Sequence, residues 1–232
     1  MTEHNQDQGD DAAQGGREPL RAPEAQEKIA RIPKAVIKRL SLYTRVLQQL
    51  EWANVEKVSS QELAEQLGLN SAQVRKDLAY FGQFGVPGLG YYVGELRQNL
   101  KRILRTDRSV RVVIVGVGNL GSALMSYGGF MRQGVKFEMA FDNDPSKIGT
   151  TWNNIAIHHV DNLERYLGRA GADIAILSVP ADAAQGLVDR LVKCGVAGIL
   201  NFVPKRLIVP PGVKVHYVDL AIEIESLSYY LK

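Results

Sequence analysis

Apolar side chains recur at helical spacing from Pro33 onward. The first run consists of Val36, Leu40, Tyr43, Leu47 and Leu50. Residues three and four apart lie on one face of an α-helix, so this run predicts a long first helix with Pro33 in its first turn. Residues 1–28 have almost no large apolar side chains, and we expect a disordered tail there.

Two shorter helices with a tight turn between them are predicted next. Ser59 and Glu62 have the spacing of a capping box, which indicates a helix that ends at Gly68. Ser71 can start the following helix, which we expect to run to about Phe81. One face of this second helix carries Val74, Leu78 and Phe81. The opposite face carries Ala72, Arg75, Lys76, Ala79 and Tyr80.

This pair of helices has the arrangement of a helix-turn-helix, in which the second helix lies in the major groove of DNA. Small side chains at Ala72 and Ala79 would let the helix approach the base edges. Arg75 and Lys76 can bond guanine or phosphate. The candidate DNA-binding residues of the helix are Ser71, Ala72, Arg75, Lys76 and Tyr80. A solvated charged face is the alternative interpretation.

Glycines punctuate residues 81–92 and alternate with apolar side chains, which is typical of a hairpin. A hairpin after a recognition helix is a wing, and its glycines would permit close approach to a minor groove. The candidate DNA contacts in the wing are Gly88, Gly90 and Tyr91. The alternative is a simple interdomain loop, although the segment is long for one.

Continuous apolar runs replace the helical spacing after residue 110. Residues 112–115 are all β-branched, as in a strand buried on both faces of a parallel sheet. A GxGxxG motif follows at once, in which Gly116 would make the tight turn, Gly118 would admit a pyrophosphate and Gly121 would let the helix pack on the strand.

The next apolar strand ends in Asp142, about 20 residues after the glycine motif. Its carboxylate can accept hydrogen bonds from an adenine ribose and would repel a 2′-phosphate, which favours NAD(H) over NADP(H). The predicted cofactor-binding residues of this site are Gly116, Val117, Gly118, Asn119, Leu120, Gly121 and Asp142.

The rest of the chain completes an α/β fold. Apolar strands at 174–179 and 198–202 are separated by a helix, which is the alternation of a doubly wound sheet. Asp219 is a natural N-cap for a final helix that is apolar on much of its circumference. Such a helix needs more than one partner surface, so we expect a homodimer built through it.

These patterns divide the chain into segments with different charge. They are a tail over 1–28, a winged-helix domain over 29–92, a linker helix over 93–109, a Rossmann domain over 110–218 and a dimerisation helix over 219–232. Residues 29–109 carry 13 basic and 7 acidic groups, whereas residues 1–28 carry 3 and 7. The local basic excess favours a polyanionic partner, although modest excesses also occur on ordinary protein surfaces.

Other classes of protein are disfavoured by the composition. The single cysteine, Cys194, cannot form an intramolecular disulfide, and no apolar run approaches the roughly 20 residues that cross a bilayer. We therefore expect a cytoplasmic protein without a membrane partner. His158 and His159 have no nearby cysteine or paired acid, so we predict no metal site.

Taken together, these residues resemble the redox-sensing transcriptional repressors called Rex. The similarity covers residue 32 to about residue 231. The segments that carry it are IPKAVIKRLSLYTRVLQQL (32–50), SSQELA (59–64), VRKDLAYFGQFGVPGLGY (74–91), GVGNLG (116–121) and VDLAIEIESLSYYL (218–231).

The resemblance implies a homodimer whose C-terminal helices are swapped between subunits, with NADH closing the dimer and releasing operator DNA. It further implies that Arg45 in the first helix, Tyr127 after the first Rossmann helix and Asp219 form a network that senses the nicotinamide. We assign Arg45 to the candidate DNA-binding residues, and Tyr127 and Asp219 to the candidate cofactor-binding residues. Because a dimer has two-fold symmetry, its DNA site should be an inverted repeat.

Two other functions are consistent with part of the pattern. An NAD-dependent dehydrogenase would share the Rossmann domain, but the chain has no substrate domain and no histidine obviously paired with an acid for general acid/base work, so we assign no catalytic residue. A nucleotide-gated interaction module would lack the salt-sensitive affinity for duplex DNA that a repressor should have.

Overall fold

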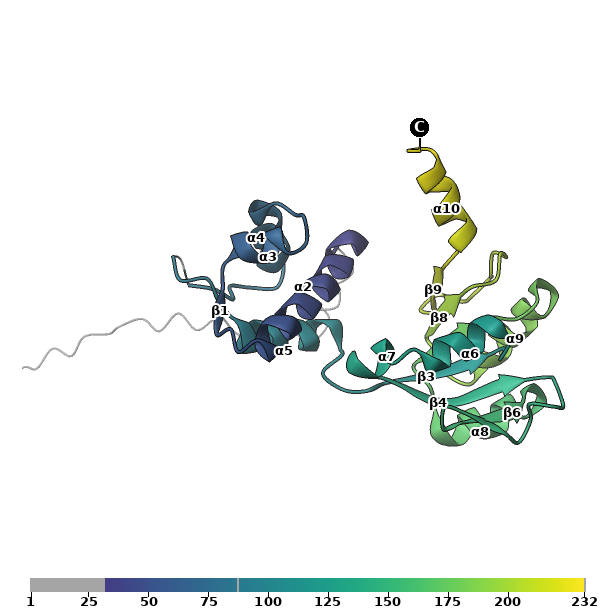
Figure 1. Ribbon diagram of the computed structural model, residues 1–232. Coiled ribbons are helices and arrows are strands. Elements are labelled where there is room, and N and C mark those ends of the chain that lie inside the picture. Colours follow the sequence, from purple (N-terminus) through teal and green to yellow (C-terminus); the bar gives the residue numbers. More distant parts are fainter. Residues whose placement is uncertain (1–31, 87, 232) are drawn as a thin grey trace, which may run out of the picture. The chain divides into compact units, whose positions relative to one another are not determined.

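The computed structural model describes residues 32–86 and 88–231, so the tail expected over 1–28 lies outside the described residues. The chain divides into two compact units, with the division between Leu100 and Lys101. Figure 1 labels most of the helices and strands of both units. Each unit has its own hydrophobic core.

The N-terminal unit is built mainly from helices. They are α2 (Lys34–Trp52), α3 (Ser60–Glu65), α4 (Ser71–Ala79) and α5 (Val93–Leu104). Two short strands, β1 (Lys57–Val58) and β2 (Tyr91–Tyr92), pair antiparallel. Most of the apolar positions that the helical spacing predicted are buried, but Leu50 and Phe81 are only half-buried. The buried core residues of the four helices include Val36, Leu40, Tyr43, Leu47, Leu63, Val74, Leu78, Val93, Leu96 and Leu100.

Side chains cap both short helices. Ser59 and Glu62 form the predicted capping box: the Glu62 amide donates to Ser59 Oγ (3.1 Å), and the Ser59 amide donates to Glu62 Oε2 (2.7 Å). Helix α4 is capped by Asn70, whose Oδ1 accepts from the Ala72 amide at 2.7 Å. Ser71 is therefore the first residue of the helix and does not cap it.

The wing differs from the predicted hairpin. Strand β2 pairs with β1, which lies more than 30 residues earlier in the chain, and not with the segment just before it. Within the wing itself, the described residues make one isolated bridge, between Val86 and Gly90. The glycine-rich segment is thus a loop closed by a non-local strand pair.

The linker helix is shorter than predicted. Helix α5 ends at Leu104, and Arg105 takes a left-handed conformation with φ of +56°, so no helix extends to residue 109. The buried residues of α5 are Val93, Leu96 and Leu100, and they all belong to the N-terminal unit. The first part of the predicted linker, residues 93–100, therefore belongs to the N-terminal unit.

A mixed sheet forms the centre of the C-terminal unit, with the strand order β5-β6-β4-β3-β7-β8-β9. Its strands are β3 (Val110–Val115), β4 (Val135–Asp142), β5 (Thr151–Trp152), β6 (Ile155–His159), β7 (Ile174–Leu177), β8 (Gly198–Asn201) and β9 (Lys214–Tyr217). Neighbouring strands are parallel except for the β5–β6 pair. This is the doubly wound α/β fold that the sequence predicted.

Apolar side chains cover both faces of the sheet, as the continuous apolar strands predicted. The helices are α6 (Asn119–Ser126), α7 (Gly129–Arg132), α8 (Leu163–Ala170) and α9 (Ala181–Lys193), with a short 3₁₀ helix η1 (Val160–Asn162). Val113 and Val115 join one core cluster with side chains of α8 and α9. Val112 and Ile114 join a second cluster with Met125 of α6.

The last helix, α10 (Leu220–Ser228), begins after β9 and projects away from the sheet (Figure 1). Asp219 caps it as predicted, because its Oδ1 accepts from the amides of Ala221 (3.0 Å) and Ile222 (3.3 Å). Apolar side chains of the helix are 58–68% exposed, and they are Leu220, Ile222, Ile224 and Leu227. Across the described residues, no helix is both long and apolar enough to span a membrane.

Candidate nucleotide and nucleic-acid binding sites

A crevice opens at the carboxyl ends of β3, β4 and β7. The order of strands reverses at β3, because β4 and β6 follow on one side and β7 and β8 on the other. Nucleotides bind at such a reversal point in doubly wound sheets. The cavity has a volume of about 330 Å³, and its lining includes Gly116, Gly118, Asp142, Lys147, Ser178 and Leu187.

The three motif glycines have different surroundings. Gly116 has φ of +96°, and a Cβ there would lie 2.2 Å from the carbonyl oxygen of Ser178. A Cβ on Gly121 would lie 2.0 Å from the carbonyl oxygen of Gly116, so Gly121 is required for close packing of α6 on the loop. No heavy atom lies within 4 Å of a Cβ built on Gly118. The structure thus leaves space for a ligand at the glycine to which the sequence assigned pyrophosphate contact.

Helix α6 begins at this loop without a side-chain cap. Gly118 occupies the N-cap position, and Asn119 and Leu120 in the first turn are exposed. The first amides of an α-helix have no partner within the helix, and the helix dipole favours an anion there. The start of α6 can therefore accept a phosphate of a bound nucleotide.

Asp142 is 8% exposed and holds the glycine loop in place. Its Oδ2 accepts from the Val117 amide at 2.6 Å, and its Oδ1 accepts from the Asp144 amide at 2.9 Å. Lys147 Nζ lies 3.5 Å from the same carboxylate. Asp142 thus has a structural task that the sequence did not indicate, in addition to lining the cavity.

The polar residues of the crevice that the sequence did not indicate are Asn143, Lys147 and Ser178. Lys147 follows Asp142 by five positions, within the loop after β4. Ser178 directly follows β7, and its Oγ donates to the Gly116 carbonyl oxygen at 2.9 Å. Only their positions in the sequence could have indicated them, because residues just after parallel strands lie at the carboxyl edge of the sheet, where ligands bind.

Tyr127 and Asp219 lie outside the crevice lining. Tyr127 is 60% exposed, and its ring packs edge-on against Phe130 with centroids 5.3 Å apart. A Cβ on Gly129 would lie 2.3 Å from the Tyr127 ring, so this ring position depends on the glycine. Asp219 lines a different cavity of about 330 Å³ with Asn201, Lys205, Arg206 and Tyr217.

In the N-terminal unit, the polar face of α4 is accessible. Ala72, Arg75, Lys76 and Tyr80 are exposed and Ser71 is half-buried, whereas Val74 and Leu78 are buried. Arg45 is exposed on α2. In the wing, Gly88 and Gly90 have φ of +79° and +83°, in the left-handed region that favours glycine, and Tyr91 is half-buried.

A buried carboxylate that the sequence did not indicate fixes α4 to α2. Asp77 is 0% exposed and accepts hydrogen bonds from Arg39 Nε (2.5 Å), Arg39 Nη2 (2.8 Å), Tyr43 Oη (2.7 Å) and Gln73 Nε2 (2.7 Å). Burial alone would raise the pKa of Asp77, but the hydrogen bonds from Arg39, Tyr43 and Gln73 lower it below its ordinary value. Asp77 is therefore ionised, and it fixes α4 against α2.

One histidine, His159, lies close to an acid, Asp161, which the sequence did not indicate. Its Nδ1 lies 3.4 Å from Asp161 Oδ2 and accepts from the Asp161 amide at 3.1 Å. His159 is the N-cap of η1. His159 therefore stabilises a turn, and its contact with Asp161 is not an arrangement for acid/base chemistry.

Comparison with known proteins agrees with this arrangement. A family described as a putative DNA-binding protein N-terminus matches residues 31–79, and a CoA binding domain family matches residues 107–205. The redox-sensing transcriptional repressor Rex of Syntrophobacter fumaroxidans is 46% identical over 205 residues, which cover 88% of this chain and 98% of the relative. The chain belongs to the Rex family. Rex of Anoxybacillus flavithermus is 46% identical over 202 residues, which cover 87% of this chain and 95% of the relative.

Solved structures of a Rex-family repressor, RSP, are also similar. RSP in complex with β-NAD⁺ and operator DNA has a TM-score of 0.81 and 39% identity, covering 86% of this chain and 92% of the RSP chain. RSP in complex with β-NADH has a TM-score of 0.77 and 37% identity, covering 87% and 94%. The predicted Rex membership and the fold, a DNA-binding N-terminal domain followed by a Rossmann domain, are confirmed. The relatives' names identify repressors and not dehydrogenases.

Proposed function

We propose that this Rex-family repressor binds operator DNA through α4 and the wing, and binds NAD(H) in the crevice of its Rossmann sheet. NADH favours the state that leaves DNA, and NAD⁺ opposes that change. The observation that carries the proposal is the presence in one chain of an exposed basic recognition helix and of a glycine loop with free space at Gly118.

NAD(H) is preferred to coenzyme A as the nucleotide. The glycine loop and the start of α6 serve any pyrophosphate, so they do not distinguish the two. Asp142 at the end of β4 favours a ribose with free hydroxyl groups, whereas the ribose of coenzyme A carries a 3′-phosphate that the carboxylate would repel. RSP, the similar Rex-family repressor, has been solved with β-NAD⁺ and with β-NADH.

Arg45, Tyr127 and Asp219 are the residues to which we assign the response to nicotinamide. NAD⁺ carries a positive ring charge that NADH lacks. A carboxylate near the ring therefore prefers the oxidised form, and a guanidinium that competes for the carboxylate prefers the reduced form. A ligand shifts the equilibrium between two conformations only as far as its affinities for them differ. The difference in ring charge between NAD⁺ and NADH supplies such a difference in affinity.

The proposal is tested by fluorescence anisotropy of a labelled inverted-repeat duplex, with NADH titrated against a fixed NAD⁺ background. We expect NADH to release the duplex and excess NAD⁺ to restore binding. Asp219→Asn retains the Oδ1 that caps α10 but loses the charge, so it should bind DNA and respond weakly to NADH. Wild-type protein that binds NADH but no duplex at low salt would contradict the repressor function.

We further propose a homodimer assembled through α10, with an inverted repeat as its DNA site. The apolar side chains of α10 are mostly exposed in the single chain, and burial in a second copy would remove them from water. Ile224→Glu is expected to shift the protein from dimer to monomer in size-exclusion chromatography with light scattering. Glu223→Gln on the same helix is the control and should remain dimeric. A wild-type monomer at working concentration would exclude this assembly.

A further inference from the structure

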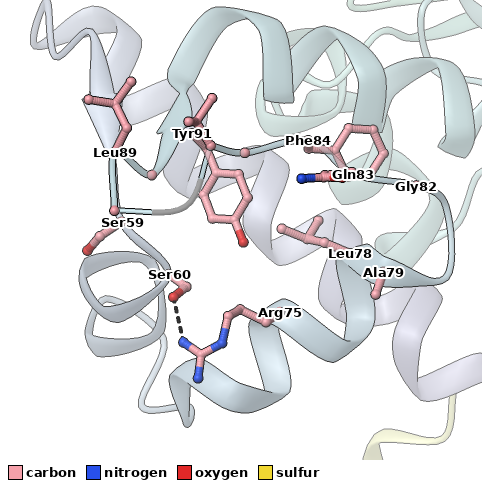
Figure 2. A pocket seen from close by; sticks show the side chains of 14 residues that line it. Ser59, Ser60, Arg75, Leu78, Ala79, Gly82, Gln83, Phe84, Leu89 and Tyr91 are labelled. Carbon is pink, nitrogen blue, oxygen red and sulfur yellow. Dashed lines mark hydrogen bonds between the residues drawn. The ribbon is translucent and has the colours of Figure 1, made fainter. Parts of the chain in front are cut away.

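A groove separates the recognition helix from the wing. It has a volume of about 640 Å³ (Figure 2). One wall is formed by α4 with Leu78 and Ala79, and the other by the wing with Phe84 and Leu89. Ser59 and Ser60 at the start of α3 close one end. The walls are thus largely apolar, although Gln83 of the wing also lines the groove.

Arg75 is the one charged residue among the described residues that line the groove. Its Nη1 donates to Ser60 Oγ at 2.9 Å, so the guanidinium lies across the groove toward α3. Lys76, the next residue, is exposed and does not line the groove. Arg75 therefore lies in the groove and Lys76 lies on the surface outside it. The sequence, in which the two residues are adjacent, did not distinguish them.

Tyr91 supplies a second polar group opposite Arg75. Its hydroxyl points into the groove in Figure 2. Burial raises the pKa of Tyr91, and the positive charge of Arg75 opposes the rise, which is consistent with two groups that share one space. A Cβ on Gly85 would lie 2.8 Å from the Tyr91 ring, so the glycine admits the ring to this position.

We propose that the groove holds the sugar-phosphate backbone of DNA, with one phosphate bound by Arg75, Ser60 and Tyr91. The inference rests on the proposed DNA-binding function and assigns Arg75 to phosphate and not to a base. A backbone that passes from the major groove at α4 to the minor groove at the wing must cross the space between them. Its phosphates need positive charge and hydrogen-bond donors, and its deoxyriboses match apolar walls.

The test compares Arg75→Gln with wild type on two duplexes, one selected by the wild-type protein from a random pool and one of unrelated sequence. A phosphate contact is independent of sequence, so affinity for both duplexes should fall by the same factor, about 10-fold near 0.1 M salt. The slope of log K against log salt should become shallower by about 0.9. Arg75→Lys retains the charge and should recover most of the slope.

Lys38→Gln removes one charge from α2 outside the groove and is the matched control for net charge. An equal change of slope in Lys38→Gln would overturn the proposal, as would an Arg75→Gln protein that loses discrimination at one base pair with its slope unchanged. Ser60→Ala and Tyr91→Phe should each lower the affinity for both duplexes by the same factor, which should be smaller than the factor for Arg75→Gln. Wild-type protein without salt-dependent DNA binding would instead overturn the proposed function, and the inference with it.

Discussion

Asp77→Ala is expected to lower the free energy of unfolding of the N-terminal unit by about 3–5 kcal/mol, the range measured when a buried ion pair loses one partner. Arg39 and Tyr43 would both lose the carboxylate that they bond. Because Asp77 lies in α4, the loss should also loosen the recognition helix and abolish specific DNA binding. Urea unfolding of the full chain followed by circular dichroism measures stability, and hydrogen exchange over residues 71–79 locates the change.

Two variants separate the buried charge from ordinary surface effects. Asp77→Asn retains the side-chain volume but leaves Arg39 without its counter-ion, so it should remain strongly destabilised. Glu65→Ala removes an exposed carboxylate from the neighbouring α3 and should change stability by less than about 0.5 kcal/mol. If Asp77→Ala and Glu65→Ala unfolded at the same urea concentration, Asp77 would not anchor α4.

The same carboxylate makes stability depend on pH in a defined direction. The hydrogen bonds hold the pKa of Asp77 in the folded protein below its value in the unfolded chain, which is near 3.9. The stabilisation is therefore fully present above about pH 4 and is lost as the pH falls through the lower, folded-state pKa. Wild type should lose stability over this acid range more steeply than Asp77→Asn does.

Asp77 illustrates what the sequence could not provide. The apolar periodicity of α4 identified Val74 and Leu78 as buried, but a charged residue between them was assigned no role. Its main partners, Arg39 and Tyr43, lie 38 and 34 positions earlier, and no local pattern records such a contact. The β1–β2 pair was missed for the same reason, because its strands are distant in sequence.

The nucleotide crevice was predictable because its determinants are local. An apolar strand, a glycine loop and a helix are consecutive in the chain, and the end of the next parallel strand places Asp142 at the same edge of the sheet. The hydrogen bond from the Val117 amide to Asp142 could not be predicted, because it depends on the loop's own conformation. Exposure of Arg75 was predicted, but its direction across the groove was not.

Gly118→Ala and Gly121→Ala are expected to have different effects, although both residues belong to one motif. Gly118 has φ of −81°, which alanine adopts readily. A Cβ on Gly118 would have no heavy atom within 4 Å, so Gly118→Ala should retain the fold. The added methyl group would occupy the space through which pyrophosphate approaches the backbone. NADH affinity should therefore fall at least about 10-fold, a loss of about 1.4 kcal/mol of binding free energy.

Gly121→Ala should damage the fold as well as the site. Its Cβ would lie 2.0 Å from the Gly116 carbonyl oxygen, so α6 would have to move away from the loop. Overpacking of this kind costs about 1–3 kcal/mol, and the displaced helix would no longer present its first amides to a phosphate. The melting temperature and NADH affinity should fall together, whereas in Gly118→Ala the affinity falls alone.

Calorimetric titration with NADH and thermal unfolding of each full-length variant distinguish these outcomes. Gly168→Ala in α8 is the matched control. A Cβ on Gly168 also has no heavy atom within 4 Å, and Gly168 is exposed and does not line the crevice. It should raise stability by about 0.5–1 kcal/mol, since alanine favours a helix, and leave NADH binding unchanged. If Gly118→Ala bound NADH as tightly as wild type, the pyrophosphate would not lie over the glycine loop, and the nucleotide would have to bind elsewhere in the Rossmann unit.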